Sequence, residues 1–197
     1  KKLEKILVSR DDKDYFYQCI KSDPEHVNVF GKFRKKNDPV FAADQRSKYF
    51  KYQGVGLDVF SLEKSNRFAA HMAKFLYQNL IHPTQYIKNR FWRHFAIKSV
   101  QLLNFGLLIP LCRLIGRINH KGQYRYKLGS GFYQCGFSAE DILPLRTMEF
   151  EGIEFPVPGN TDAYLTKIYG DWRKLPSEEQ IRKTMHYPLY IKEIFGE

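Results

Sequence analysis

The chain has 197 residues, of which 43% are hydrophobic and 16% aromatic; this composition excludes a disordered segment and fits one folded domain. The formal net charge is +11, and no Asp or Glu occurs from Lys64 to Ala139, where twelve Lys and Arg residues lie. Such a one-signed stretch attracts polyanions. The candidates are an anionic membrane surface, a nucleotide diphosphate, a phosphate-bearing glycan and nucleic acid.

The N-terminal residues and the cysteines bear on processing and on the cellular compartment. Charged residues interrupt any apolar run in residues 1–20, so a signal peptide is not predicted there. The chain starts at Lys1 without an initiator Met, which indicates processing or a fragment. Three well-separated cysteines without metal-ligand spacing predict reduced thiols in a cytoplasmic protein; they are Cys19, Cys112 and Cys135.

The first third of the chain predicts a helix followed by strands. Residues 1–8 are expected to be the end of a helix, and Val27–Arg34 alternates as a strand does. Residues 35–53 are polar and predict a loop or a poorly paired edge. Gly54–Leu62 is apolar on both faces, which is typical of a central strand, and Asp58 lies in its middle. A carboxylate in an apolar strand is costly unless it is paired, hydrogen-bonded or bound to metal.

Residues 64–119 predict a helical region. Pro83 is expected to separate two helices, and Pro110 to open a short third one at its first turn. In that third helix Arg113, Arg117 and Lys121 are predicted to form a basic stripe at i, i+4 spacing. The apolar run Leu102–Cys112 is shorter than a membrane span. Two interpretations stay open: an amphipathic helix lying on a membrane, and a packed helix with a solvated basic face.

The last fifty residues carry clear turn and cap signals. Met148–Val157 predicts a hairpin that turns at Glu151-Gly152. Thr161–Tyr169 predicts a short helix, with Asn160 or Thr161 as its N-cap and Gly170 after its end. A last helix is expected to begin at Pro176.

Three residues stand out as candidates for chemistry. Asp58 is in the apolar strand, and Lys32 and Arg34 are on the strand that precedes it. If these strands are neighbours, the carboxylate could bind a divalent metal while the cations hold phosphate oxygens. The alternative is a structural pair between Asp58 and Arg34.

Several segments of the sequence are similar to those of the LicD/fukutin family of phosphotransferases. The first half contributes Lys21-Ser-Asp-Pro-Glu, Phe30-Gly-Lys-Phe-Arg34 and Gly54-Val-Gly-Leu-Asp-Val-Phe-Ser-Leu62. The second half contributes Phe150-Glu-Gly-Ile-Glu-Phe-Pro-Val-Pro158, Tyr164-Leu165, Tyr169-Gly-Asp-Trp172, Leu175-Pro176, Arg182 and His186. These segments follow the family's order over residues 20–190. Each one is weak alone, and the ordered set carries the resemblance.

The resemblance implies an α+β fold with a partial nucleotidyltransferase-like core. We expect a small mixed sheet, a large helical region, a C-terminal hairpin and C-terminal helices. Residues 1–197 would form one LicD-type domain that is truncated at its N-terminus, with residues 64–120 as a helical basic insertion. The family's D-D-D-I-D metal motif is expected shortly before residue 1, and Asp11, Asp12 and Asp14 do not replace it. We therefore expect this piece to be inactive alone and its parent to be active.

The implied activity is transfer of a phosphorylated alcohol from a CDP-activated donor, such as CDP-choline, to a cell-surface glycan or teichoic acid precursor. Asp58 would bind Mg²⁺ and help catalysis, while Lys32 and Arg34 would contact the donor phosphates. Arg182 and His186 would contact donor or acceptor.

The remaining expectations concern partners and location. The partners would be the CDP-alcohol and a glycan or lipid-linked glycan, with an anionic membrane surface as a further candidate. The enzyme would be cytoplasmic, with peripheral attachment to the inner face of the membrane. The rival interpretations are a basic nucleic-acid-binding module, because Tyr and Phe are interleaved with cations in residues 121–133, and a catalytically dead module that binds glycan or lipid.

Overall fold

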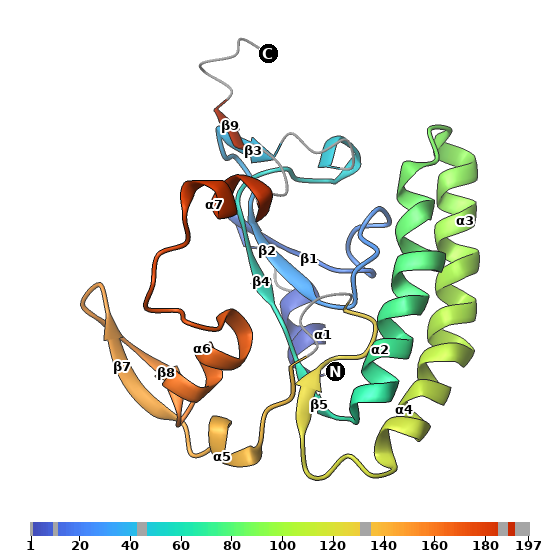
Figure 1. The fold of residues 1–197 in the computed structure, drawn as a ribbon. Coiled ribbons are helices and arrows are strands. Elements are labelled where there is room, and N and C mark those ends of the chain that lie inside the picture. Colours follow the sequence, from blue (N-terminus) through green and yellow to red (C-terminus); the bar gives the residue numbers. More distant parts are fainter. Residues whose placement is uncertain (1, 10–11, 43–46, 131–134, 185–188, 192–197) are drawn as a thin grey trace.

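A computed structural model describes residues 2–9, 12–42, 47–130, 135–184 and 189–191. Helices and small antiparallel sheets alternate in it, which confirms the α+β class. Figure 1 shows a central sheet, a layer of long helices beside it, and a hairpin with short helices on the other side.

The central sheet contains β1 (Tyr15–Gln18), β2 (Gly31–Lys35) and β4 (Gly56–Val59), with β2 in the middle. Both pairings are antiparallel, so the expectation of a mixed sheet was wrong. The predicted strand at 54–62 was wrong in two respects. It stops at Val59, and within the described residues β4 is an edge strand, where Leu57 is 71% exposed. Apolar residues on both faces predict a central strand only where other layers cover both faces.

Two further two-stranded pairings extend the β structure. β5 (Leu62–Lys64) follows β4 after a break and pairs with β6 (Tyr124–Tyr126). β3 (Val40–Ala42) pairs with β9 (Leu189–Ile191), so the segment 35–53, expected to be a loop or edge, contains a short strand and the turn η1 (Ser47–Tyr49). Segments far apart in the sequence therefore close the fold.

Strand β2 begins four residues later than predicted. Val27 and Phe30 are buried, but the chain between them is irregular, and Gly31 is the first strand residue. Gly31 leaves room for the Tyr17 ring, because a Cβ there would overlap the end of that ring and force it to move. The alternating apolar and polar residues at 27–34 thus cover a buried turn followed by a strand. Contacts with residues distant in the sequence hold the turn, and a local pattern does not show them.

The helical region is confirmed. Its elements are α2 (Arg67–Leu76), η2 (Tyr77–Ile81), η3 (His82–Tyr86), α3 (Arg90–Leu103), η4 (Asn104–Leu108) and α4 (Ile109–Arg117). The side chains of Asn66 and Asn89 cap α2 and α3 by accepting backbone hydrogen bonds. Pro83 lies in the break, as predicted.

Pro110 does not open a separate helix, because the helix runs without interruption from Arg90 to Arg117. Pro110 follows the π-helical turn η4, and such turns accommodate a residue that lacks the backbone donor. The predicted basic stripe is also corrected: α4 ends at Arg117, and Lys121 lies beyond it with a φ of 50°.

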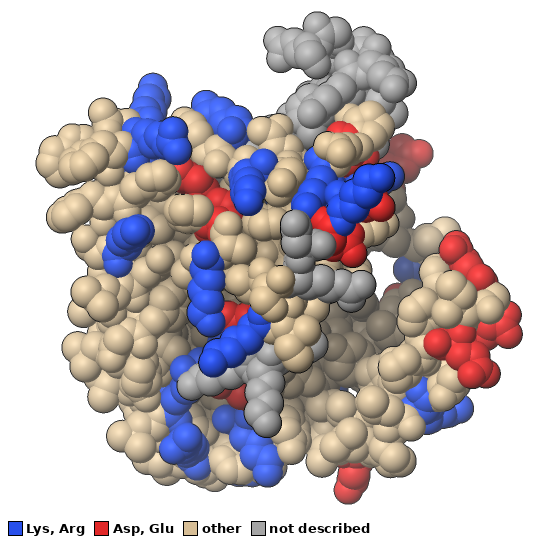
Figure 2. Space-filling model, turned by 180° about the vertical axis from the view of Figure 1, so that it is seen from behind, with Lys and Arg blue, Asp and Glu red and all other residues tan. Residues whose placement is uncertain are grey.

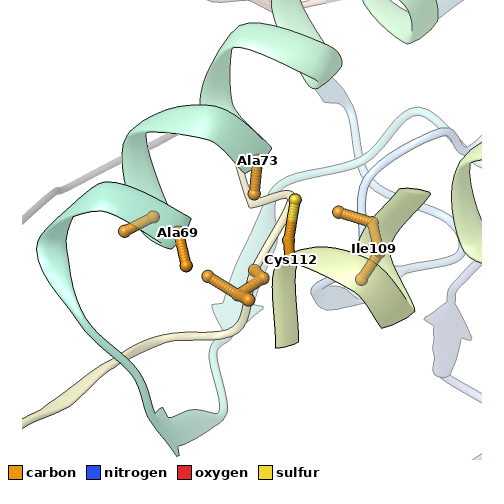
Figure 3. Close-up of a cluster of buried hydrophobic side chains, with 6 residues drawn as sticks. Ala69, Ala73, Ile109 and Cys112 are labelled. Carbon is orange, nitrogen blue, oxygen red and sulfur yellow. The ribbon is translucent and has the colours of Figure 1, made fainter. Parts of the chain in front are cut away.

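The contact between α2 and α4 is close because small residues face each other. Ala69, Ala73, Ile109 and Cys112 form a buried cluster (Figure 3). A Cβ on Gly116 would lie 2.7 Å from Ser65 Oγ. Close approach of this kind packs the two helices densely and fixes how α4 is rotated about its axis.

The C-terminal third matches its local signals. Its elements are α5 (Ala139–Ile142), β7 (Arg146–Phe150), β8 (Ile153–Val157), α6 (Thr161–Tyr169) and α7 (Glu178–Thr184). At the other end of the chain, the predicted helix is α1 (Lys2–Ser9). The β7–β8 hairpin turns at Glu151 and Gly152, both at positive φ. Asn160 caps α6 and Gly170 ends it at a φ of 73°.

Candidate functional site

The register of the central sheet brings two of the predicted site residues together. Lys32 and Asp58 are direct partners across β2 and β4, and Lys32 Nζ lies 2.8 Å from Asp58 Oδ1. The side chain of Lys32 is 18% exposed and that of Asp58 is 35% exposed. The pair is therefore within reach of solvent, and it is an ion pair that a ligand phosphate could enter.

Arg34 has a different environment, although it is on the same face of β2. It is buried, its Nε donates to Gln18 Oε1 at 2.6 Å, and its Nη1 donates to the Gly54 carbonyl at 2.8 Å. The structural pair of Arg34 with Asp58, which the sequence left open, is not formed, since the carboxylate pairs with Lys32. These contacts favour a structural role for Arg34, and its role in donor binding stays a prediction.

Of the two C-terminal candidates, the structure describes only Arg182. Arg182 lies on α7, 3.8 Å from Glu178 in an exposed pair one helical turn apart. His186 lies outside the described residues. Substrate contacts by either residue stay predictions.

The magnesium prediction can be compared with the side chains that could act as metal ligands. Within the part of the chain that the structure describes, no three His, Cys, Asp or Glu side chains cluster in a way that would hold a metal ion. Asp58 offers one carboxylate, and an ammonium group lies against it. Magnesium takes near-octahedral oxygen coordination, so these residues by themselves do not fit such a site.

A buried polar network next to the pair was missed by the sequence analysis. Asp23 is 2% exposed and accepts from Gln18 Nε2 at 2.7 Å and from the backbone nitrogens of Glu25 and Lys51. Gln18 in turn accepts from Arg34. The Asp-Pro-Glu segment of the resemblance therefore folds as a turn that positions Arg34.

The same turn holds the long helix through Glu25. Its two carboxylate oxygens accept from Arg93 Nε and Nη2, each at 2.9 Å, and His94 Nε2 lies 2.8 Å from Oε1. Arg93 is 1% exposed, stacks 3.6 Å from the centre of the Tyr49 ring, and has a raised pKa because it bonds Glu25. A cation on the inner side of a helix was the available signal for this pair.

His26 completes the buried network. It is 1% exposed, and burial lowers its pKa to about 4, although the hydrogen bond at 2.8 Å to the Phe30 carbonyl opposes that shift. The imidazole is therefore neutral near pH 7, with Nε2 donating to Phe30. His26 is a structural residue, because a neutral buried ring bonded to the backbone fixes the turn before β2.

An aromatic series connects this region to α6. Phe30, Phe60, Tyr126, Phe137 and Tyr164 follow one another with ring centroids 4.6, 5.1, 5.8 and 4.6 Å apart. The hydroxyl oxygens of Tyr126 and Tyr164 lie 2.9 Å apart. The tyrosine of the resembling Tyr164-Leu165 segment thus serves packing between the sheet and the C-terminal region.

A cavity of about 610 Å³ lies on the opposite face of the sheet from Lys32 and Asp58. Side chains of alternate strand residues point to opposite faces, and those that line the cavity are the odd-numbered ones Tyr15, Tyr17, Phe33, Lys35 and Leu57, together with Leu7 and Asp12. The largely apolar cavity and the ion pair are therefore separate features.

Comparisons of the chain with protein-family models, with curated proteins and with solved structures find no match. The case for a function therefore rests on the residues and their geometry.

Proposed function

We propose that the chain belongs to an enzyme that transfers a phosphorylated alcohol from a CDP-activated donor to a hydroxyl group of a glycan. The observation that carries the proposal is the Lys32–Asp58 pair, which joins the two segments of the LicD resemblance at one position of the sheet. The nucleotidyltransferase-like core is part of the proposal, and so is magnesium, which would need oxygen ligands besides Asp58.

The pair suits phosphate binding because it is weak. A partly exposed ion pair contributes at most about 1 kcal/mol, so the donor diphosphate, with its larger charge, competes for the Lys32 ammonium group. A charge-assisted hydrogen bond from Lys32 then holds a phosphate oxygen. Asp58 stays beside the bound donor with its carboxylate released from the pair.

The proposed step transfers the phosphorylated alcohol to the acceptor hydroxyl group. The acceptor hydroxyl oxygen attacks the phosphorus that carries the alcohol, and a new P–O bond forms while the P–O bond to CMP breaks. CMP leaves with the electron pair of that bond. Asp58 accepts the hydroxyl proton, and a carboxylate in this role contributes roughly 10²–10⁴-fold to the rate.

The test separates the two residues by the sign of their effects. In calorimetric titrations with CDP-choline, Lys32→Met should weaken binding about tenfold, the loss of one charge-assisted bond. Asp58→Asn should strengthen donor binding, because it removes the carboxylate that competes for Lys32. In a CMP-release assay of the full-length protein with a glycan acceptor, Asp58→Asn should lower turnover.

Lys183→Met is the matched control, since Lys183 is 72% exposed on α7, where it pairs with Glu179 one helical turn away. It should leave titration and turnover unchanged. If neither CDP-choline nor CDP-ribitol binds, or if Lys32→Met binds as the unaltered chain does, the proposal is wrong.

A further inference from the structure

The long helix Arg90–Arg117 has one face packed against the protein along its whole length. Its buried residues are Arg93, Ile97, Asn104, Ile109, Cys112 and Gly116. An α-helix turns about 100° per residue, so the spacing from Asn104 to Ile109 would rotate the buried side away from the protein. The wider π turn η4 takes up one extra residue and restores the phase. The opposite face is consequently continuous as well.

That opposite face is apolar and exposed. On the long helix and its end, the exposed fractions range from 40% for Ile115 to 77% for Leu102; the residues are Phe91, Trp92, Phe95, Leu102, Leu103, Leu107, Leu111, Leu114, Ile115 and Ile118. Phe68 and Phe75 of the neighbouring helix α2 are 61% and 59% exposed. We call these residues the outer helical face. So many exposed large apolar side chains on two neighbouring helices indicate an interaction site.

Cations border the outer helical face. Lys88, Arg90, Lys98 and Arg117 are exposed along the long helix, and residues 65–139 contain no Asp or Glu. Acidic residues gather instead on the β7–β8 hairpin, which is exposed on the opposite side of the molecule (Figure 2). The partner of the outer helical face is therefore expected to be apolar in its middle and negatively charged around it.

We propose that the outer helical face binds the surface of an anionic lipid bilayer, with the long helix lying along it. Apolar side chains would enter the headgroup boundary while the bordering cations meet lipid phosphates. At one end Phe91, Trp92 and Phe95 pack edge to face, with centroids 5.3 and 6.1 Å apart, next to Arg90. Aromatic rings beside cations are typical of the membrane–water boundary.

The helix lies on the bilayer and does not cross it. By length and composition it is the one helix in the described part of the chain that could span a membrane, and only 22% of its most apolar window is buried in the protein. However, its inner face carries Arg93, bound to Glu25, and Asn104, both fully enclosed by protein. A helix held by the domain along one side has a single face left for lipid.

The charge pattern also argues against a second copy of the chain as the occupant. A two-fold dimer through the outer helical face would bring the basic borders of both copies into one interface, and residues 65–139 of the partner would offer no Asp or Glu to pair with them. Like charges in that arrangement repel, whereas phosphate headgroups neutralise them. The bilayer proposal does not depend on the transferase activity.

The test uses the two tryptophans of the chain. Trp92 lies on the outer helical face, and Trp172 lies outside it, after α6. In Trp172→Phe only Trp92 remains, and in Trp92→Phe only Trp172 remains. Mixed phosphatidylcholine and phosphatidylglycerol vesicles should shift Trp92 fluorescence to the blue, and brominated lipids should quench it. Trp172 should show neither change. Pure phosphatidylcholine should bind less, and salt should weaken binding.

Matched substitutions distinguish binding through the outer helical face from nonspecific binding to vesicles. Leu102→Gln with Leu114→Gln, or Lys98→Glu with Arg117→Glu, should weaken vesicle binding about tenfold or more. Leu175→Gln and Lys183→Glu should change nothing, although Leu175 is 89% exposed. Circular dichroism melting curves confirm that each variant folds.

The proposal is overturned if the unaltered chain does not sediment with anionic vesicles at low salt. It is also overturned if binding to vesicles leaves the Trp92 fluorescence unshifted. A dimer in ultracentrifugation would overturn it as well, if acrylamide does not quench Trp92 in that dimer and vesicles do not dissociate it.

Discussion

Two ion pairs of this protein each join a basic side chain to a carboxylate, but their surroundings are opposite. Arg93 and Glu25 are 1% and 9% exposed, and two parallel hydrogen bonds join them. Lys32 and Asp58 are joined by one contact, and their side chains are 18% and 35% exposed. A buried pair cannot exchange its partner without leaving a bare charge in the interior, whereas a partly exposed pair can. The first pair therefore holds the helix to the sheet, and the second is available to a ligand.

The largest effect is expected for breaking the buried pair. Arg93→Met removes both hydrogen bonds of the guanidinium group and leaves the buried Glu25 carboxylate with His94 alone beside it, so it should lower the free energy of unfolding by about 3–5 kcal/mol. Urea denaturation measures this change. The double variant Arg93→Met with Glu25→Leu should recover much of the loss, because no unpaired charge remains. A double variant as unstable as the single one would mean that the contact with Tyr49, and not the charge, carries the stability.

The buried imidazole should make stability depend on pH. In the folded chain the pKa of His26 is about 4, below the usual value of 6.5. Between these values the unfolded chain binds more protons, so stability is fully present above pH 6.5 and is lost as the pH falls to 4. The loss amounts to about 3 kcal/mol. Unfolding curves at a series of pH values test this, and His26→Gln, which keeps a donor for Phe30, should flatten the dependence.

The smallest effect is expected for breaking the exposed pair. Lys32→Met and Asp58→Asn should each change the free energy of unfolding by at most about 1 kcal/mol, and both should fold normally. Thermal melting of the two variants beside the unaltered chain is the measurement. A loss as large as that of Arg93→Met would place the Lys32–Asp58 pair among the structural contacts and remove the physical basis for ligand exchange.

The elements that the sequence predicted well depend on neighbouring residues only. The Glu151-Gly152 turn, the Asn160 cap and the stop at Gly170 each follow from the backbone preferences of a few residues. The helical region followed from its apolar periodicity. The prediction that Pro110 starts a new helix failed because the π turn before it lets one helix continue through the proline.

The candidate site was predicted in part. Asp58 and Lys32 were named from sequence, and their meeting at 2.8 Å follows from the β2–β4 register. The separation of Lys32 from Arg34 was not predictable, because alternation puts both on one face and only the tertiary contacts of Gln18 and Gly54 bury one of them.

The sequence by itself determined the α+β class, the position of the helices, the turns and caps, and the excess of positive charge in residues 64–139. Only the tertiary structure decided that Glu25 meets Arg93, 68 positions later, that β4 lies at an edge, and that the long helix shows an apolar face to the outside. The reason is physical. Propensity, capping and periodicity act over a few residues, whereas burial and pairing depend on which distant segments come to lie against each other.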